Sequence, residues 1–227
     1  MKLLMPKKAV ARTAPTPATD MEAEIARLAR QNASLRRAIA RLQVFRAMAY
    51  RDPLTGLWNR RYFEERLKEE FSRSRRAGAD RKFSVMVIDI NGFKEVNDQN
   101  GHQAGDAMLK AVGEFLVAHL RTHDVPCRTG GDEFMVLLPD LSASDCAPVI
   151  ARLREQLVRT NRSRPIPIEL SIGTASWPEV AESCDKILAV ADAAMYEDKR
   201  TQKAARGTTP RTSRLLRTGR TRIASVG

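Results

Sequence analysis

The chain has 227 residues, of which 43% are hydrophobic, so it can form one packed domain with appendages and is too apolar to be wholly disordered. Its formal net charge of +12 suggests nucleic-acid binding, but the excess charge lies at the ends. Residues 1–19 hold four Lys/Arg and residues 199–227 hold nine, with no acid in either, which leaves 26 basic and 27 acidic residues in 20–198. The near-neutral middle argues against a specific nucleic-acid module. Solvated tails are favoured, with a tail contact to nucleic acid or an anionic membrane as the alternative.

Three scattered cysteines, Cys127, Cys146 and Cys184, lack the spacing of metal ligands and indicate reduced thiols. No apolar run approaches the roughly 18 residues of a membrane helix, and the opening "MKLLMPKK" has too short an apolar core for a secretory signal. The sequence therefore predicts a cytoplasmic protein without a membrane span.

Residues 1–19 contain three prolines and predict a flexible basic arm. Over 20–50 the apolar residues recur at heptad positions a and d, with Asn32 at a central a position. One such Asn is typical of a two-stranded coiled coil whose register it fixes. We expect a parallel dimeric stalk; a single amphipathic helix packed on its own domain is the alternative. The apolar heptad residues are Met21, Ile25, Leu28, Leu35, Ile39 and Leu42.

After the stalk, Asp52-Pro53 predicts an N-cap followed by the first residue of a helix, and Asn59 can cap the next helix. The stripe Phe63, Leu67 and Phe71 gives that second helix an apolar face.

Downstream, the continuous apolar run 82–90 predicts a central strand. A helix over 105–120 follows, and then two strands around a two-residue type I′ turn at Gly130-Gly131. A Ser142/Asp145 capping box opens another helix, and a strand in 166–177 and a helix over 184–200 end the domain. The order β-α-β-β-α-β predicts an α+β fold of the ferredoxin or polymerase-palm type.

Three carboxylates stand where two strands end or begin. Asp89 ends the run 82–90, and Asp132 and Glu133 follow the glycine turn. If that strand pairs with the hairpin, Asp89 and Asp132 meet at one edge of the sheet, as two carboxylates that bind Mg²⁺ would. Two solvated turn carboxylates are the alternative.

The segment 89–106, "DINGFKEVNDQNGHQAGD", is predicted to be a loop and suits a nucleotide. Gly92 lets backbone N–H groups approach a phosphate, and Lys94 adds charge nearby. Asn97 and Asp106 suit a base, because a carboxylate accepts hydrogen bonds from guanine N1–H and N2–H₂. The plain alternatives are a turn residue for Asn97, a helix cap for Asp106 and a loop residue for His102.

Five blocks, "DPLTGLWNRRYF", "DINGFKEVNDQNGHQAGD", "RTGGDEF", "LSIGTA" and "ADAAMYEDK", resemble in order and spacing the GGDEF family of diguanylate cyclases over residues 50–200. In that family two GTP condense to cyclic di-GMP, each held by one protomer of a transient antiparallel dimer. The resemblance implies a GGDEF fold over 51–204, with a mainly antiparallel sheet flanked by helices, and a basic disordered tail over 205–227.

The resemblance also implies roles. Asp89, Asp132 and the carbonyl of Ile90 would hold two Mg²⁺ (or Mn²⁺) ions. Glu133 would complete the catalytic group, either in the metal shell or in deprotonating the attacking 3′-OH. The implied substrate-binding residues are Gly92, Phe93, Lys94, Lys199 and Lys203 for the triphosphate, Asn97 and Asp106 for guanine, and His102 as a further substrate-binding residue.

Arg121-Thr-His-Asp124 stands where many family members carry an Arg-x-x-Asp site for inhibition by their own product, and Arg152 matches a second arginine of that site. An Arg can fork onto guanine O6 and N7 while an Asp accepts from N1–H and N2–H₂. A salt bridge at a helix end is the alternative. A catalytically silent cyclic di-GMP receptor that uses Arg121 and Asp124 is the second hypothesis for the whole chain.

The chain departs from the family pattern at a few positions. Asn91 replaces a frequent Asp, Thr129 replaces a frequent aromatic residue, and Gln202-Lys203-Ala204 replaces a frequent Gly-Arg-Asn. We expect a homodimer through the stalk; a higher assembly and a regulatory protein docked on the stalk are left open.

Overall fold

The computed structural model describes residues 17–78, 81–180 and 183–208. Most of the predicted arm and tail lies outside these residues. The chain divides into two compact units, Met1–Ala49 and Tyr50–Gly227. No helix among the described residues combines the length and the hydropathy needed to cross a membrane.

The described part of the first unit is helix α1 (Pro17–Tyr50), whose last residue already belongs to the second unit. Its a and d side chains are exposed, from 50% at Leu28 to 66% at Leu42. An apolar stripe exposed in the single chain is what a coiled-coil seam presents before it meets its partner. The dimer itself stays a prediction.

The second unit is built on a five-stranded sheet in the order β1-β3-β4-β2-β5. Strand β2 lies between β4 and β5 and is antiparallel to both, whereas the short β1 pairs in parallel with β3. This confirms the predicted mainly antiparallel α+β fold. The strands are β1 (Trp58–Asn59), β2 (Phe83–Ile90), β3 (Val125–Gly130), β4 (Glu133–Pro139) and β5 (Leu170–Trp177).

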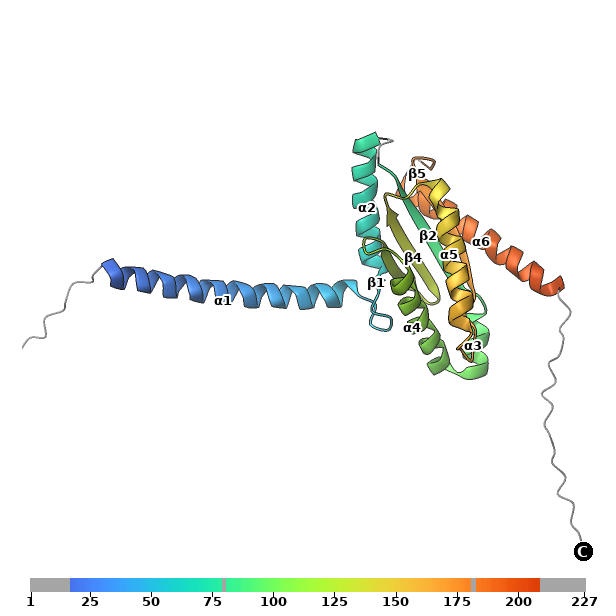
Figure 1. Cartoon of the computed structure of the whole chain (residues 1–227), viewed down its shortest axis with the longest axis horizontal. Coiled ribbons are helices and arrows are strands. Elements are labelled where there is room, and N and C mark those ends of the chain that lie inside the picture. The colour runs from blue at the N-terminus through green and yellow to red at the C-terminus, as the bar shows by residue number, and fades with distance from the viewer. Residues whose placement is uncertain (1–16, 79–80, 181–182, 209–227) are drawn as a thin grey trace, which may run out of the picture. The chain divides into compact units, whose positions relative to one another are not determined.

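Helices cover both faces of the sheet (Figure 1). Met86 and Ile88 of β2 pack in one apolar cluster with α4 and α5, and Val85 and Val87 pack in a second cluster with α2 and α6. All eight residues of β2 are buried, which explains why its sequence is an unbroken apolar run. The helices are α2 (Arg60–Ala77), α3 (Phe93–Asn100), α4 (His102–His119), α5 (Ala143–Asn161) and α6 (Cys184–Thr208).

Two local predictions are confirmed and one is wrong. The Asn59 side chain caps α2 by accepting from Tyr62 N–H, and Ser142 and Asp145 form the capping box of α5. No helix begins at Pro53. Instead, Asp52 Oδ1 accepts from the N–H of Thr55 at 2.8 Å and from its Oγ1 at 2.7 Å, which closes a turn. A short Asx-type turn and a helix N-terminus begin with the same residue types.

Two segments are more helical than predicted. Helix α3 occupies residues 93–100, which were predicted as loop, and α6 continues to Thr208, beyond 200 and into the stretch assigned to the tail. Strand β1 was not predicted, because two residues carry no periodicity.

Helix α6 packs closely on β5, the edge strand of the sheet. A Cβ at Gly173 would lie 2.0 Å from Met195 N and 2.2 Å from Ala191 O, so only glycine allows this backbone contact. Further along α6, Asp198 Oδ2 accepts from Ile172 N–H at 2.8 Å and Gln202 Nε2 donates to Leu170 O at 3.1 Å. Side chains of α6 thus bond the edge backbone of β5.

Candidate active site

The three carboxylates meet at one rim of the sheet. Asp89 is paired with Glu133 in the β2–β4 register, and Ile90 N–H donates to Asp132 O at 3.3 Å. Asp89 is 8% exposed, Asp132 is half-buried and Glu133 is exposed. The antiparallel pairing of β2 with the hairpin therefore brings Asp89 and Asp132 together, as the strand pattern predicted.

The hairpin turn is shifted by one residue from the prediction. Gly130 pairs with Glu133, so the two turn residues are Gly131 and Asp132 instead of Gly130 and Gly131. The register shifts between Arg128 and Gly130, and this bulge accounts for the difference. Gly130 and Gly131 have φ of 153° and 49°, values that favour glycine. Asp132 is consequently presented by the turn and not by the strand.

Arg128 fixes this turn, a role that sequence reasoning missed. Its Nε and Nη2 donate to Gly131 O at 3.0 and 2.8 Å, and its Nη1 lies 3.2 Å from Asp52 Oδ2. Burial raises the pKa of Asp52, but hydrogen bonds from Thr55 and the charge of Arg128 outweigh this and hold the pKa below its ordinary value. Asp52 and Arg128 are 76 positions apart, so no local pattern links them.

Asp89 is paired with a lysine from the last helix. Lys199 Nζ lies 2.6 Å from Asp89 Oδ1, and the lysine side chain is 42% exposed against 11% for the aspartate. The ammonium offsets part of the cost of burying this carboxylate. The contact also places a cation of α6 at the carboxylate rim, next to the segment predicted for phosphates.

The donor set suits a metal that arrives with a nucleotide. Among residues 17–78, 81–180 and 183–208, no three His, Cys, Asp or Glu side chains form a cluster that could hold an ion. Mg²⁺ generally needs fewer protein ligands than that, because one or two carboxylates act together with substrate phosphates and water. Asp89, Asp132 and the Ile90 carbonyl fit this requirement and do not fit a closed structural metal site.

Helices α3 and α4 bring the predicted guanine-binding residues side by side. A Cβ at Gly105 would lie 2.0 Å from Asn97 Oδ1 and 3.2 Å from Phe93 Cζ, so this buried glycine makes room for both side chains. Asp106 is the next residue and is exposed, as is His102 in the first turn of α4. Gly101, not Asp106, is the N-cap of α4, which leaves the Asp106 carboxylate open to a ligand.

A cavity of about 380 Å³ lies between the start of α3 and the end of α6. Gly92, with φ of 71°, is the N-cap of α3 and forms one wall. Lys199 and Lys203 come from α6 on the other wall, whereas Lys94 is exposed on α3 and is not among the lining residues. The lining residues are Asn91, Gly92, Glu95, Lys199, Gln202 and Lys203.

The predicted product site lies at the other end of β3. Asp124 Oδ2 accepts from Arg121 N–H at 2.8 Å. Burial raises the pKa of Asp124 above its ordinary value, although that hydrogen bond and the charges of His123, Arg121 and Arg152 act against it. The six residues of β3 at about 3.3 Å each separate Asp124 from the hairpin by roughly 20 Å.

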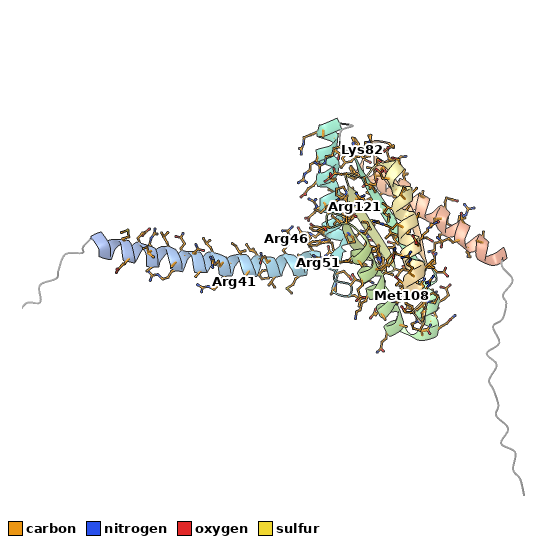
Figure 2. All side chains as sticks on the ribbon, viewed as in Figure 1. Arg41, Arg46, Arg51, Lys82, Met108 and Arg121 are labelled. Atoms are coloured by element: carbon orange, nitrogen blue, oxygen red, sulfur yellow. The ribbon has the colours of Figure 1, made fainter. Side chains whose placement is uncertain are left out.

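Arg121 lines two cavities. One, of about 220 Å³, also has Arg152 in its wall, and the other, of about 640 Å³, contains Asp124 and Arg51 (Arg51 and Arg121 are labelled in Figure 2). Arg152 Nη2 donates to His119 O at 3.1 Å. The structure therefore brings Arg121, Asp124 and Arg152 to one region. Both Arg121 and Asp124 lie in the described part of the chain, and they form no salt bridge there that would support the helix-end alternative.

The sequence of this chain is similar to known proteins over the same region. The family profile described as "Diguanylate cyclase, GGDEF domain" matches residues 49–205. The chain is 36% identical over 165 residues to the probable diguanylate cyclase DgcT of Escherichia coli, covering 70% of this chain and 36% of that protein. It is 36% identical over 194 residues to the diguanylate cyclase TpbB of Pseudomonas aeruginosa, covering 82% and 41%. The chain spans less than half the length of these curated relatives.

Solved structures show the same likeness. The diguanylate cyclase SiaD of Pseudomonas aeruginosa, solved in complex with its activator SiaC, is 34% identical with a TM-score of 0.67, covering 80% of this chain and 69% of that chain. The coiled coil and GGDEF domain of DgcB from Caulobacter crescentus, solved in complex with c-di-GMP, is 29% identical with a TM-score of 0.68, covering 78% and 94%.

Proposed function

The chain belongs to the GGDEF family of diguanylate cyclases, and we propose that it condenses two GTP into cyclic di-GMP with release of two pyrophosphates. The carboxylate rim carries this proposal: Asp89 and Asp132 converge beside a cavity that two lysines of α6 line. A protein that only bound the product would not need this arrangement.

The proposed reaction is an in-line nucleotidyl transfer. The 3′-oxygen of one GTP attacks the α-phosphorus of the other, a new O3′–Pα bond forms, and the bond to pyrophosphate breaks. When bound, Mg²⁺ or Mn²⁺ neutralises charge on the phosphates. Asp89, Asp132 and the Ile90 carbonyl would hold the metal, and the exposed carboxylate of Glu133 can accept the proton of the 3′-OH or complete the metal shell.

Two groups of residues would recognise the two ends of the substrate. We assign the guanine to Asn97 and Asp106, with His102 nearby, and the triphosphate to the backbone of Gly92 and Phe93 with Lys94, Lys199 and Lys203. Each protomer provides one such half-site, and ring closure needs two transfers. An antiparallel dimer of catalytic units is therefore part of the proposed mechanism. We place this reaction in the cytoplasm, where the three cysteines, which are free in the structure, would stay reduced.

Purified protein incubated with GTP and Mg²⁺, followed by chromatography of the nucleotides, tests the proposal. We expect cyclic di-GMP and pyrophosphate in a ratio of one to two. Tight binding of added cyclic di-GMP without any synthesis would instead make this chain a receptor. If neither synthesis nor binding is detected, both functions are refuted for the isolated chain.

Product inhibition through Arg121 and Asp124 gives a separate prediction. Arg121→Ala removes the fork that would bind guanine O6 and N7, so we expect an unchanged initial rate and a higher final yield of cyclic di-GMP. Progress curves with and without a cyclic di-GMP-degrading phosphodiesterase measure this. The wild-type curve should rise when product is removed, and the variant curve should not. An identical yield plateau in both proteins would exclude the inhibitory site.

The stalk gives a further prediction. Leu35→Pro interrupts α1 at a d position, which should weaken the proposed dimer and lower the activity per protomer at low protein concentration. A dilution series of both proteins, with Ser34→Ala as the control on the same helix, measures the effect. An activity per protomer that is independent of dilution in both proteins would remove the stalk from the mechanism.

The complex of SiaD with SiaC supports a regulatory protein as a further partner, and we propose α1 as its docking segment.

A further inference from the structure

Two departures from the family pattern meet in space. Asn91 follows the last residue of β2, and Gln202 lies in α6, 111 positions later. Asn91 Nδ2 donates to Gln202 Oε1 at 2.9 Å. The two residues that depart from the family pattern therefore contact each other, and this contact links the end of the central strand to the last helix.

The remaining groups of both amides are bonded as well. Asn91 Oδ1 accepts from Ser171 Oγ at 2.7 Å. Gln202 Nε2 donates to Leu170 O at 3.1 Å and to Asp198 Oδ2 at 2.8 Å. These bonds orient both amides, because reversing either one would bring donor against donor or acceptor against acceptor. The amide pair is thus held from β2, β5 and α6 at once.

The same pair separates the two walls of the 380 Å³ cavity. Asn91 immediately precedes Gly92 on the first wall, and Gln202 lies between Lys199 and Lys203 on the second. Residues four apart on a helix share a face, so the two ammonium groups line the cavity together. One hydrogen bond between uncharged groups therefore connects the Gly92 side of the cavity to the lysine side, and it adds no counterion to either lysine.

We infer that Asn91 and Gln202 are positioning residues for the triphosphate. This inference rests on the proposed function. The amide pair would hold the phosphate-facing surface of α6 at the distance that a bridging phosphate chain requires. It touches neither Asn97 nor Asp106, so it should act on the phosphate part of the substrate and not on guanine. Lys199 is ion-paired with Asp89, and Glu95 adds a carboxylate to the cavity lining. A small displacement of α6 would therefore change the distances from the two lysines to these carboxylates and to a bound phosphate.

The test uses the full chain as Asn91→Ala, Gln202→Ala and the double variant, with Thr201→Ala as control. Thr201 is exposed on α6, and its hydroxyl donates to Glu197 O of the same helix. Calorimetry measures the affinity for GMP and for a GTP analogue whose α and β phosphorus atoms are joined by methylene, both with Mg²⁺. We expect about tenfold weaker binding of the analogue and unchanged binding of GMP in each single variant, and in turnover a higher KM with little change in kcat.

The double variant shows whether Asn91 and Gln202 act through their common hydrogen bond or contribute separately to binding. Because the two side chains act through one bond, the double variant should bind the analogue no more weakly than either single variant. The exchanged pair, Asn91→Gln with Gln202→Asn, keeps both amides and should recover part of the affinity.

Equal losses for GMP and the analogue, additive losses in the double variant, or no loss at all would overturn the inference. Thermal unfolding shows whether each variant is folded, and none of the substitutions removes the packing of α6 on Gly173 or the bond between Asp198 and Ile172 N–H. If wild-type protein binds no analogue and makes no cyclic di-GMP, the proposed function fails and this inference fails with it. If wild type binds and turns over but the variants match it, the inference alone fails.

Discussion

Asp132→Asn is expected to abolish cyclic di-GMP synthesis while leaving the fold intact. Asn keeps the size of the side chain and is well tolerated in a turn, so the Gly131-Asp132 turn can form. Its backbone carbonyl still accepts from Ile90 N–H. The amide removes the negative charge that a metal ligand needs. We expect a loss of at least about 100-fold in kcat/KM, because even residues that only support metal ligands cost 10–100-fold when replaced.

Asp192→Asn serves as the matched control, since it removes the same charge from an exposed position of α6. Binding gives a second measurement: Mg²⁺ should strengthen GTP binding to wild type and to the control, but not to Asp132→Asn. Synthesis retained by the folded Asp132 variant would remove this residue from the metal site.

Gly173→Ala should lower the free energy of unfolding strongly, and far more than the same change at Gly113. The new Cβ would lie 2.0 Å from Met195 N, 2.2 Å from Ala191 O and 2.7 Å from Ala194 C, all backbone atoms of α6 that cannot rotate away. Overpacking of this kind costs about 3 kcal/mol or more. For a domain of this size that corresponds to a fall in Tm of roughly 6–12 °C, measured by calorimetry.

Gly113→Ala is the control for this second prediction. Its Cβ would meet Thr55 Cβ at 3.2 Å, a tight contact with a side chain, and alanine favours the helix by about 1 kcal/mol over glycine. We expect a Tm close to that of wild type. Because α6 carries Lys199, the Gly173 variant should also lose GTP affinity below its Tm. A Gly173 variant as stable as the Gly113 variant would show that α6 is free to move away from β5.

The sequence predicted the parts of the fold that rest on local chemistry. The apolar run of β2, the Asn59 cap and the Ser142/Asp145 box each depend on neighbouring residues alone. Strand β1 could not be predicted, because its two residues are a strand only through parallel pairing with Cys127 and Arg128. Helix α3 has eight residues and no side-chain cap, so its stability comes from packing on α4 and not from its own sequence.

The candidate site shows the same division. Strand ends and a glycine turn sufficed to predict that Asp89 and Asp132 meet. The contacts that orient them come from distant residues: Lys199 to Asp89, Arg128 to Asp52, and Asn91 to Gln202. For Asn91 and Gln202 the sequence showed that both positions depart from the family pattern, as several others do, but it did not show that the two side chains meet.

The bonding of β5 by α6 has a consequence for self-association. An open edge strand offers its N–H and C=O groups to any other extended chain, which is a common route to aggregation. Here the carboxylate of Asp198 and the amide of Gln202 engage the edge groups of Ile172 and Leu170. A second copy therefore cannot lengthen the sheet at these residues by adding a strand. In the proposed dimeric mechanism, two catalytic units that approach along this part of β5 would therefore meet through side chains, and such a contact separates more readily than a continuous intermolecular sheet.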